Sequence, residues 1–276
     1  MSLSLSRNVP RVDHREVQAR QRTAWASGDY AVAGNALQIV SEELCETVNL
    51  CQDERVLDVA AGSFHAAFAA ARRWCDVTAT DHASDLTNRG RQRSEAGAAG
   101  VQFVDADAEA LPFPDQSFST VISAFGAMFA ADQERAASEM IRVCRRGGRL
   151  ALANWTPDGF IGQLFVTLGR HLPQATCGPA PFQWGQPERL GELFGAYGGV
   201  ETARKRVALR SRTPMDWVDK LRAAYAPVLK AFASLEPVRQ KAMRGDLLEL
   251  VTRFNRAKDS TMLVDAEYLE VVVTRR

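Results

Sequence analysis

The sequence of 276 residues predicts an α/β protein built on a doubly wound, mostly parallel sheet. Two observations support this class: five short apolar runs lie between residues 55 and 153, and helical or small-residue segments alternate with them. In addition, no internal repeat or low-complexity segment indicates a solenoid or a propeller. Strands that alternate with helices form parallel β-α-β units, because each helix crosses back over the sheet before the next strand.

The apolar runs are expected to form strands in chain order. The expected strands cover residues 55–59, 76–80, 101–104, 119–123 and 149–153. The expected helices are an Ala-rich one at about 65–73, a polar one after Asp81 and one at about 133–144. Together these elements predict a continuous α/β core from about residue 50 to residue 155.

The flanking segments are expected to be mostly helical. Residues from about 11 to 50 have loose helical spacing of apolar residues, and an amphipathic helix is expected at 161–171. Thr213 and Pro214 are typical of a helix N-cap and first turn, and a further helix is expected from residue 234 to about 255. Two more strands, near 200–209 and at 268–274, are expected to complete a seven-stranded sheet.

Composition limits the classes of function. The 34 basic and 33 acidic side chains give a net charge of +1, which offers no electrostatic footprint for nucleic acid as the main ligand. With 46% hydrophobic residues, the chain as a whole is not disordered. Residues 1–16 lack an apolar signal region, and the longest uncharged stretch, 121–131, is too short to cross a bilayer. We therefore expect a cytoplasmic protein without a membrane partner. The five cysteines and four histidines lack disulfide or ligand spacing, so no metal is expected.

The carboxyl ends of the expected strands hold the residues best suited to bind a ligand, because open parallel sheets bind ligands there. The first strand ends in Asp58-Val-Ala60-Ala61-Gly62, whose small residues let the backbone turn tightly and approach a ligand. The second strand ends at Asp81, whose carboxylate is placed to accept hydrogen bonds from both hydroxyls of a ribose. Each feature alone also fits a structural role, as a packing turn or a helix N-cap.

The loop after the third strand adds a third feature of this kind. Asp107 could present a carboxylate, and Ala108 a backbone NH, to the edge of an adenine ring. With these residues in place, residues 55–155 resemble the class I S-adenosylmethionine-dependent methyltransferases, especially the small-molecule branch similar to the ubiquinone and menaquinone methyltransferases. Looser similarity reaches residues 25–30, 154–160 and 268–275. The resemblance implies a Rossmann-like methyltransferase fold.

The resemblance also implies S-adenosylmethionine as the cofactor and binding roles for residues of this sequence. Asp58 and the turn of Ala60, Ala61 and Gly62 would hold the methionine portion. The other implied contacts are Asp81 with the ribose hydroxyls, His82 with the adenosine, Asp107 with the adenine amino group, the Ala108 NH with an adenine ring nitrogen, Ser123 and Ala124 with the region of the sulfonium and its methyl group, and Tyr30 with Trp25 in a lid. Core packing is the alternative role of the two lid aromatics.

The same resemblance suggests how the chain is divided. We expect a helical N-terminal lid at 1–50, a cofactor-binding α/β core at 51–155 and a cap insertion at 156–199. The C-terminal part, 200–276, would complete the sheet and contain a helical insertion at 213–256. Lid and insertions would enclose the methyl acceptor.

One residue of the glycine motif departs from the family pattern D-x-G-x-G-x-G. Ala60 replaces the first glycine, a mild change, but Phe64 replaces the third, where a Cβ and a ring oppose the backbone geometry and the approach of a ligand. Three interpretations are open. Phe64 packs into the helix–sheet core and leaves binding intact, or it reshapes and weakens the methionine pocket, or the protein keeps the fold without transferring methyl groups.

Apolar residues in and beside the expected cap would line a pocket for the methyl acceptor. They are Phe125, Met128, Phe129, Trp155, Phe160, Phe165 and Trp184, for which packing of the cap on the sheet is the alternative. His171 is a weak candidate for a general base, since a lone histidine is more often structural, and the catalytic residues otherwise stay unknown. The run 204–206 fits a solvated strand face better than a site for an anionic acceptor.

The sequence therefore predicts an S-adenosylmethionine-dependent methyltransferase, a monomer or homodimer, that acts on a small apolar or aromatic metabolite by in-line transfer. The alternative is a non-methylating or repurposed member of the fold with another catalytic or binding role. Phe64 is the residue that separates the two hypotheses.

Overall fold

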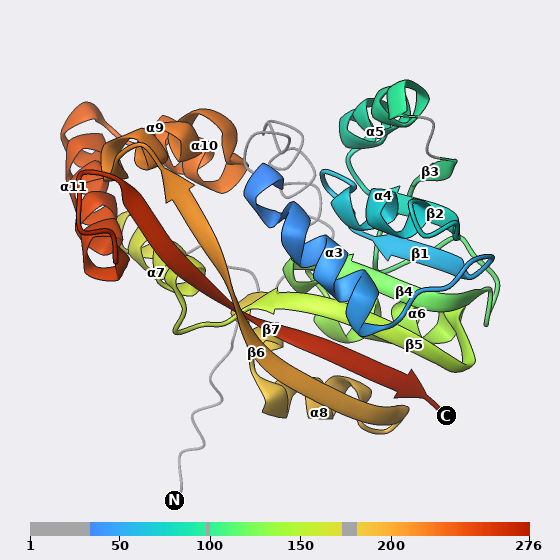
Figure 1. Ribbon diagram of the computed structural model, residues 1–276. Coiled ribbons are helices and arrows are strands. Elements are labelled where there is room, and N and C mark those ends of the chain that lie inside the picture. Colours follow the sequence, from blue (N-terminus) through green and yellow to red (C-terminus); the bar gives the residue numbers. More distant parts are fainter. Residues whose placement is uncertain (1–33, 98–99, 173–180) are drawn as a thin grey trace, which may run out of the picture.

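The computed structural model describes residues 34–97, 100–172 and 181–276, and it confirms the predicted fold class. A seven-stranded sheet has the strand order β3-β2-β1-β4-β5-β7-β6 (Figure 1). Strands β1 to β5 are parallel, whereas β7 pairs antiparallel with both β5 and β6. The chain thus winds outward from β1 and β4 in both directions and closes one edge with an antiparallel hairpin.

Each predicted strand is present, and the later strands are longer than predicted. The strands are β1 (Arg55–Val59), β2 (Asp76–Asp81), β3 (Val101–Asp105), β4 (Phe118–Ala124), β5 (Cys144–Trp155), β6 (Gly198–Ser211) and β7 (Met262–Arg275). Strand β7 begins at Met262 rather than at the predicted residue 268. The prediction was too short because the first half of the strand alternates buried and half-exposed residues and includes Asp265 and Glu267. Such alternation is typical of an antiparallel strand with one covered face, so it does not form an apolar run.

Helices cover both faces of the sheet (Figure 1). Helices α3 (Gln38–Thr47), α4 (His65–Ala71) and α5 (Ser84–Gly97) lie on one face, and α6 (Gln133–Val143) and α8 (Pro187–Phe194) on the other. The start of α6 is fixed by Asp132, whose side chain accepts a hydrogen bond from the Arg135 NH at 2.9 Å. The two layers bury the central strands on both sides.

The β6–β7 hairpin projects beyond the carboxyl end of β5. Pairing of β5 with β7 ends at Trp155 and Tyr268, whereas β6 and β7 stay paired as far as Ser211 and Met262. The projecting end carries α9 (Pro214–Ala224), α10 (Ala226–Ala233) and α11 (Pro237–Phe254), at the upper left of Figure 1. The Thr213 hydroxyl caps α9 by accepting from the Asp216 NH at 3.0 Å, as its residue type predicts. Helix α10 was not predicted, and α11 starts at Pro237 rather than at residue 234.

The remaining described elements are one helix and three short 3-10 turns. They are α7 (Phe160–His171), which packs against α11, and the 3-10 turns η1 (Asn35–Leu37), η2 (Ala127–Phe129) and η4 (Pro181–Gly185). Across the described ranges, no helix combines the length and the apolar character needed to span a bilayer.

The basic run on β6 forms ion pairs with acidic residues of β7. Arg204 and Arg206 lie 2.7 and 3.6 Å from Glu267, and the Lys205 ammonium lies 2.8 Å from Glu270. Each basic residue therefore has a carboxylate partner on the neighbouring strand, as a solvated strand face predicts.

Candidate functional site

The turn after β1 has a left-handed backbone at each of the three motif positions where the family pattern has glycine. The φ angles are 53° at Ala60, 55° at Gly62 and 63° at Phe64. A residue with a Cβ adopts this conformation at a cost of roughly 1–2 kcal/mol. The chain thus keeps the geometry of the turn with one glycine in place of three, and other interactions must offset the strain at Ala60 and Phe64.

The Phe64 ring packs into the core between helix and sheet. The residue is 1% exposed, and its ring meets Phe103 of β3 edge to face, with centroids 5.0 Å apart. A Cβ placed on Gly90 of α5 would lie 2.8 Å from the Phe64 ring and 2.5 Å from the Phe103 ring, so the aromatic pair fills the space up to the α5 backbone. Phe64 lies where the first of the three interpretations expects it, outside the large cavity described below.

Asp81 connects the end of β2 to this turn. Its Oδ2 accepts a hydrogen bond from the Gly62 NH at 2.9 Å, and its Oδ1 accepts one from the Ala83 NH at 3.0 Å. The Nδ1 of His82 lies 3.7 Å from the same Oδ1. Because a carboxylate has about four lone-pair sites, Asp81 keeps acceptor capacity toward the cavity that it lines.

The end of β4 approaches the turn so closely that a glycine is required there. A Cβ on Gly126 would lie 2.1 Å from the carbonyl oxygen of Ala60. Ser123 fixes this junction, because its hydroxyl donates to the Val59 carbonyl at 2.7 Å and accepts from the Ala127 NH at 2.9 Å. The side chain of Ser123 is therefore structural, while the neighbouring Ala124 lines the cavity.

The loop after β3 brings Asp107 and Ala108 to the cavity, as predicted. Asp107 Oδ1 accepts from the Glu109 NH at 3.0 Å, and the Asp107 carbonyl accepts from the Ala110 NH at 3.0 Å. These two bonds close a tight turn around residues 107–110. Asp107 is half-buried, so its second carboxylate oxygen remains available to a ligand.

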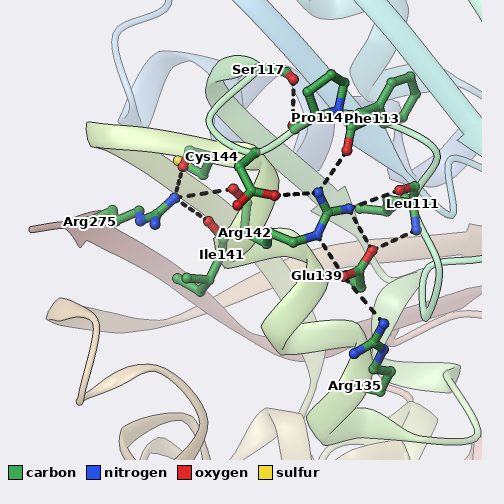
Figure 2. A network of polar contacts seen from close by, with 11 residues as sticks. Leu111, Phe113, Pro114, Ser117, Arg135, Glu139, Ile141, Arg142, Cys144 and Arg275 are labelled. Carbon is green, nitrogen blue, oxygen red and sulfur yellow. Dashed lines mark hydrogen bonds and ion pairs between the residues drawn. The ribbon is translucent and has the colours of Figure 1, made fainter.

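A guanidinium on α6 holds the rest of this loop (Figure 2). Arg142 donates to both oxygens of Glu139 at 2.8 Å, to the carbonyls of Leu111 and Phe113 at 2.9 and 2.7 Å, and to Asp115 at 2.9 Å. Glu139 in turn accepts from the Leu111 NH at 2.8 Å. The hydrogen bonds from Arg142 keep the pKa of Glu139 below its ordinary value. No pattern in the sequence predicted this network, which fixes the segment that carries Asp107.

A cavity of about 470 Å³ lies between these strand ends and helices α7 and α9, which form part of a helical cap over the carboxyl ends of the strands. Its volume lies within the roughly 300–1,000 Å³ of small-molecule sites. One half is lined by residues 60–63 and 106–109 together with Asp81, His82 and Leu86. The other half is mostly aromatic and apolar, with Phe125, Phe129, Trp155, Trp217, Leu221 and Tyr225 in its wall.

The aromatic half has a rigid floor. Phe125 stacks on Trp155 with centroids 3.8 Å apart and planes 10° apart, and Tyr268 meets Phe125 edge to face at 5.6 Å. Tyr268 is held by its hydroxyl, which donates to Glu43 of α3 at 3.2 Å. Burial raises the pKa of the Tyr225 hydroxyl on the opposite wall above its usual range, so Tyr225 is neutral at physiological pH.

The structure separates the predicted site residues into two groups. Those that line the cavity are Ala60, Ala61, Gly62, Asp81, His82, Asp107, Ala108, Ala124, Phe125, Phe129 and Trp155. Met128, Phe160 and Trp184 do not line it, because each is fully buried among core side chains. Phe160 packs on Trp217 and Phe254, and Trp184 on Phe194. For these three residues the expected pocket role is wrong and the packing alternative holds. Phe165 also lies outside the cavity wall and packs on Phe182.

His171 is not placed as a general base for this cavity. Its Nε2 lies 2.7 Å from Asp246 Oδ2 of α11, and neither residue lines the cavity. The pair joins the end of α7 to α11, so its role is structural. Tyr30 and Trp25, expected in the lid, lie outside the described residues.

Asp58 lies beneath the turn and is 1% exposed. Its Oδ2 accepts from the Ala67 NH at 2.9 Å, and its Oδ1 has no hydrogen-bond partner among the described residues. Burial, with a smaller effect of the nearby Asp81 charge, raises the pKa of Asp58 to about 8. The residue borders a small cavity that also contacts Ser41 and His65 and shares several lining residues, Ala61 among them, with the large one.

The insertion at 213–256 was expected to help enclose the acceptor, but no individual residue of α9 was predicted to belong to the site. Trp217, Lys220, Leu221 and Ala224 recur at helical spacing and line the cavity together. That spacing shows in the sequence which residues share a helix face, but not which face meets the sheet. Within the described ranges, no group of three histidine, cysteine, aspartate or glutamate side chains is placed to hold a metal ion.

Fold and site together define a class of protein. A left-handed turn after β1, a carboxylate at the end of β2 and another after β3 face one cavity, and they suit the methionine, ribose and adenine parts of S-adenosylmethionine. The unpartnered Oδ1 of Asp58 beside this turn suits the cofactor's amino group as well. The residues present therefore fit this cofactor.

Comparisons with known proteins agree with this class. Residues 57–152 match the family model described as a methyltransferase domain. A Mycobacterium tuberculosis protein, named only as uncharacterised, is 32% identical over 275 residues, which are 98% of this chain and 99% of that protein. The demethylmenaquinone methyltransferase of Thermus thermophilus is 39% identical over 125 residues, 44% of this chain and 57% of that enzyme. The solved YcgJ protein of Bacillus subtilis shares the fold, with a TM-score of 0.59 and 18% identity over 86% of this chain and 98% of that chain. This chain belongs to the class I S-adenosylmethionine-dependent methyltransferase family.

Proposed function

We propose that the protein transfers a methyl group from S-adenosylmethionine to a small, apolar or aromatic acceptor. The observation that carries this proposal is the single cavity that joins the polar strand ends to an aromatic half under the cap. A cofactor in the polar half would leave the aromatic half free for a second molecule. The near-neutral charge of the chain supports a small-molecule acceptor over nucleic acid or a membrane, and we propose a cytoplasmic monomer or homodimer.

The proposed binding roles follow the geometry. The backbone of residues 60–62 and the buried Asp58 would hold the methionine portion, and Asp81 the ribose hydroxyls. Asp107 and the Ala108 NH would bind the adenine edge, and Ala124 would lie near the reacting methyl group. Because Ser123 uses its hydroxyl within the fold, we no longer assign it a cofactor contact.

Bound S-adenosylmethionine would supply an electrophilic methyl group with a neutral leaving group. For such a reaction, orientation and exclusion of water can provide much of the rate enhancement. The stacked pair of Phe125 and Trp155, held by Tyr268, would orient a flat acceptor and keep water from it. We assign no general base, since His171 is engaged with Asp246 outside the cavity.

The test is isothermal calorimetry with S-adenosylmethionine and its demethylated product on the wild type, Asp81→Ala and Asp85→Ala. Asp81→Ala should weaken binding by roughly 10- to 100-fold, the worth of hydrogen bonds to a charged acceptor. Asp85→Ala removes an equal charge from an exposed position on α5 that does not line the cavity, so its affinity should equal that of the wild type. Absence of binding to the wild type at millimolar cofactor would refute the methyltransferase proposal.

The alternative of a non-methylating family member rested on Phe64. The ring packs against Phe103 and lies outside the cavity wall, which supports cofactor binding over this alternative. The same calorimetric titration distinguishes the hypotheses, because a repurposed protein without cofactor binding would give no heat with either compound.

A further inference from the structure

The charged side chains of the large cavity are separated by sign. The acidic side chains in its wall, Asp81, Asp107 and Glu109, all come from the polar half, at the ends of β2 and β3. The basic ones, Arg210 and Lys220, come from the end of β6 and from α9. Strands β3 and β6 are the two edges of the sheet, and α9 lies on the β6 side of the molecule, away from β2 and β3 (Figure 1). The two groups of charges therefore come from elements on opposite sides of the sheet.

Lys220 belongs to the face of α9 that meets the cavity. It lies between Trp217, Leu221 and Ala224 on the same helical stripe, and those three neighbours are apolar. A cation among apolar lining residues favours a bound molecule with an anionic group, because few other polar groups in that part of the wall contact the molecule.

The basic end carries more positive than negative charge. Arg212 and Lys220 both pair with Asp216, at 2.8 and 2.7 Å, and the Ser211 hydroxyl donates to the same carboxylate at 2.5 Å. These hydrogen bonds hold the pKa of Asp216 well below its usual range, so it stays ionised. Arg210 is exposed and has no carboxylate partner in the part of the chain that the structure describes. Of the three cations at this end, Arg212 and Lys220 therefore share one carboxylate, and Arg210 has none among the described residues.

Lys220 can leave Asp216 for an incoming anion at little cost. Asp216 would retain Arg212 and the Ser211 hydroxyl, and the Lys220 side chain is half exposed, where an ion pair contributes little. The aromatic floor of Phe125 and Trp155 belongs to the same half of the cavity.

We propose that the acceptor combines an apolar ring system with an anionic oxygen group such as a carboxylate, which Lys220 and Arg210 bind while the rings lie on Phe125 and Trp155. This proposal rests on the proposed function, because it assigns the aromatic half to the acceptor and the polar half to the cofactor. The anionic group is a recognition element, and the atom that receives the methyl group is not specified by it.

The test compares two probes of nearly equal shape, 2-naphthoate and 2-naphthalenemethanol, by calorimetry with and without saturating S-adenosylhomocysteine. The wild type should bind the carboxylate about tenfold more tightly than the neutral alcohol. Lys220→Met should lower this ratio at least threefold, and Lys220→Arg should keep most of it. Lys241→Met is the matched control, since it removes an exposed lysine from α11 outside the cavity wall and should leave the ratio unchanged.

Three results would overturn the proposal: equal affinity of the wild type for the two probes, an unchanged ratio in Lys220→Met, or no binding of either probe. A separate titration with S-adenosylhomocysteine alone distinguishes this failure from that of the proposed function. If S-adenosylhomocysteine binds and the wild type shows no preference for naphthoate, only the acceptor proposal fails. If the preference for naphthoate depends on Lys220 but S-adenosylhomocysteine does not bind, the anion site stands and the methyltransferase proposal fails.

Discussion

Replacing Phe64 by alanine and by glycine separates two energies that the turn after β1 combines. The ring is 1% exposed and packs on Phe103 and against Gly90. Its removal therefore loses the whole free energy gained by burying the ring and leaves a cavity in the core. Phe64→Ala should therefore lower the free energy of unfolding by about 3–5 kcal/mol. Phe64→Gly loses the same packing but relieves the left-handed strain at φ 63°, so it should be about 1 kcal/mol more stable than Phe64→Ala. In an exposed site with ordinary φ the order would be reversed, because glycine loses more backbone entropy on folding.

Urea unfolding of the three proteins, followed by far-UV circular dichroism, measures both differences. Calorimetry with S-adenosylhomocysteine on the same samples should give affinities within about threefold of one another, because the ring is outside the cavity wall. A tenfold gain of affinity in Phe64→Gly would show that Phe64 restricts the cofactor site. If Phe64→Ala proves at least as stable as Phe64→Gly, the strain assigned to this position is wrong.

Two further predictions concern buried carboxyls. Burial raises the pKa of Asp58 to about 8, so the folded state binds the proton more tightly than the unfolded state and stability should fall as the pH rises from about 4 to 8. Asp58→Asn cannot titrate and should flatten this slope in a series of urea titrations; a slope equal to that of the wild type would exclude Asp58 as its source. For Glu139 the sign is opposite, because the Arg142 hydrogen bonds lower its pKa, and its contribution is lost as the pH falls through that lowered value. Arg142→Gln should therefore lower the free energy of unfolding by about 2–4 kcal/mol at pH 7 and by clearly less at pH 3. The control is Arg145→Gln, which removes an exposed arginine and should lower the free energy of unfolding little at either pH.

The sheet could be predicted because its central strands are buried on both faces. Strand β5, for example, contains the apolar run 150–153, and such short runs follow one another in chain order. The hairpin of β6 and β7 was harder to delimit, since its projecting half alternates buried and half-exposed residues and ends in helices that depend on tertiary packing. Apolar runs and helical spacing are local signals, whereas the length of a projecting hairpin depends on tertiary packing.

The polar half of the cavity was predicted better than the aromatic half for a related reason. Asp81 and Asp107 follow strand ends directly, and parallel strands bring their carboxyl ends to one edge of the sheet. The orientation of an aromatic residue in the cap depends on how several helices pack. Phe129 therefore lines the cavity while its near neighbour Met128 faces the core, and no periodicity in the sequence distinguishes them.

The turn after β1 shows why a departure from a glycine motif need not change its geometry. The backbone of the turn is held from outside by the Asp81 carboxylate, which accepts from the Gly62 NH, and from within by the Ala61 carbonyl, which accepts from the Phe64 NH at 2.8 Å. The side chain then leaves toward Phe103, where burial of a phenyl ring contributes more than the left-handed conformation costs. A polar residue at position 64 would meet the same strain without that compensation. The motif thus constrains the backbone conformation directly. It constrains the residue type only indirectly, because a residue other than glycine needs favourable packing to offset the left-handed strain.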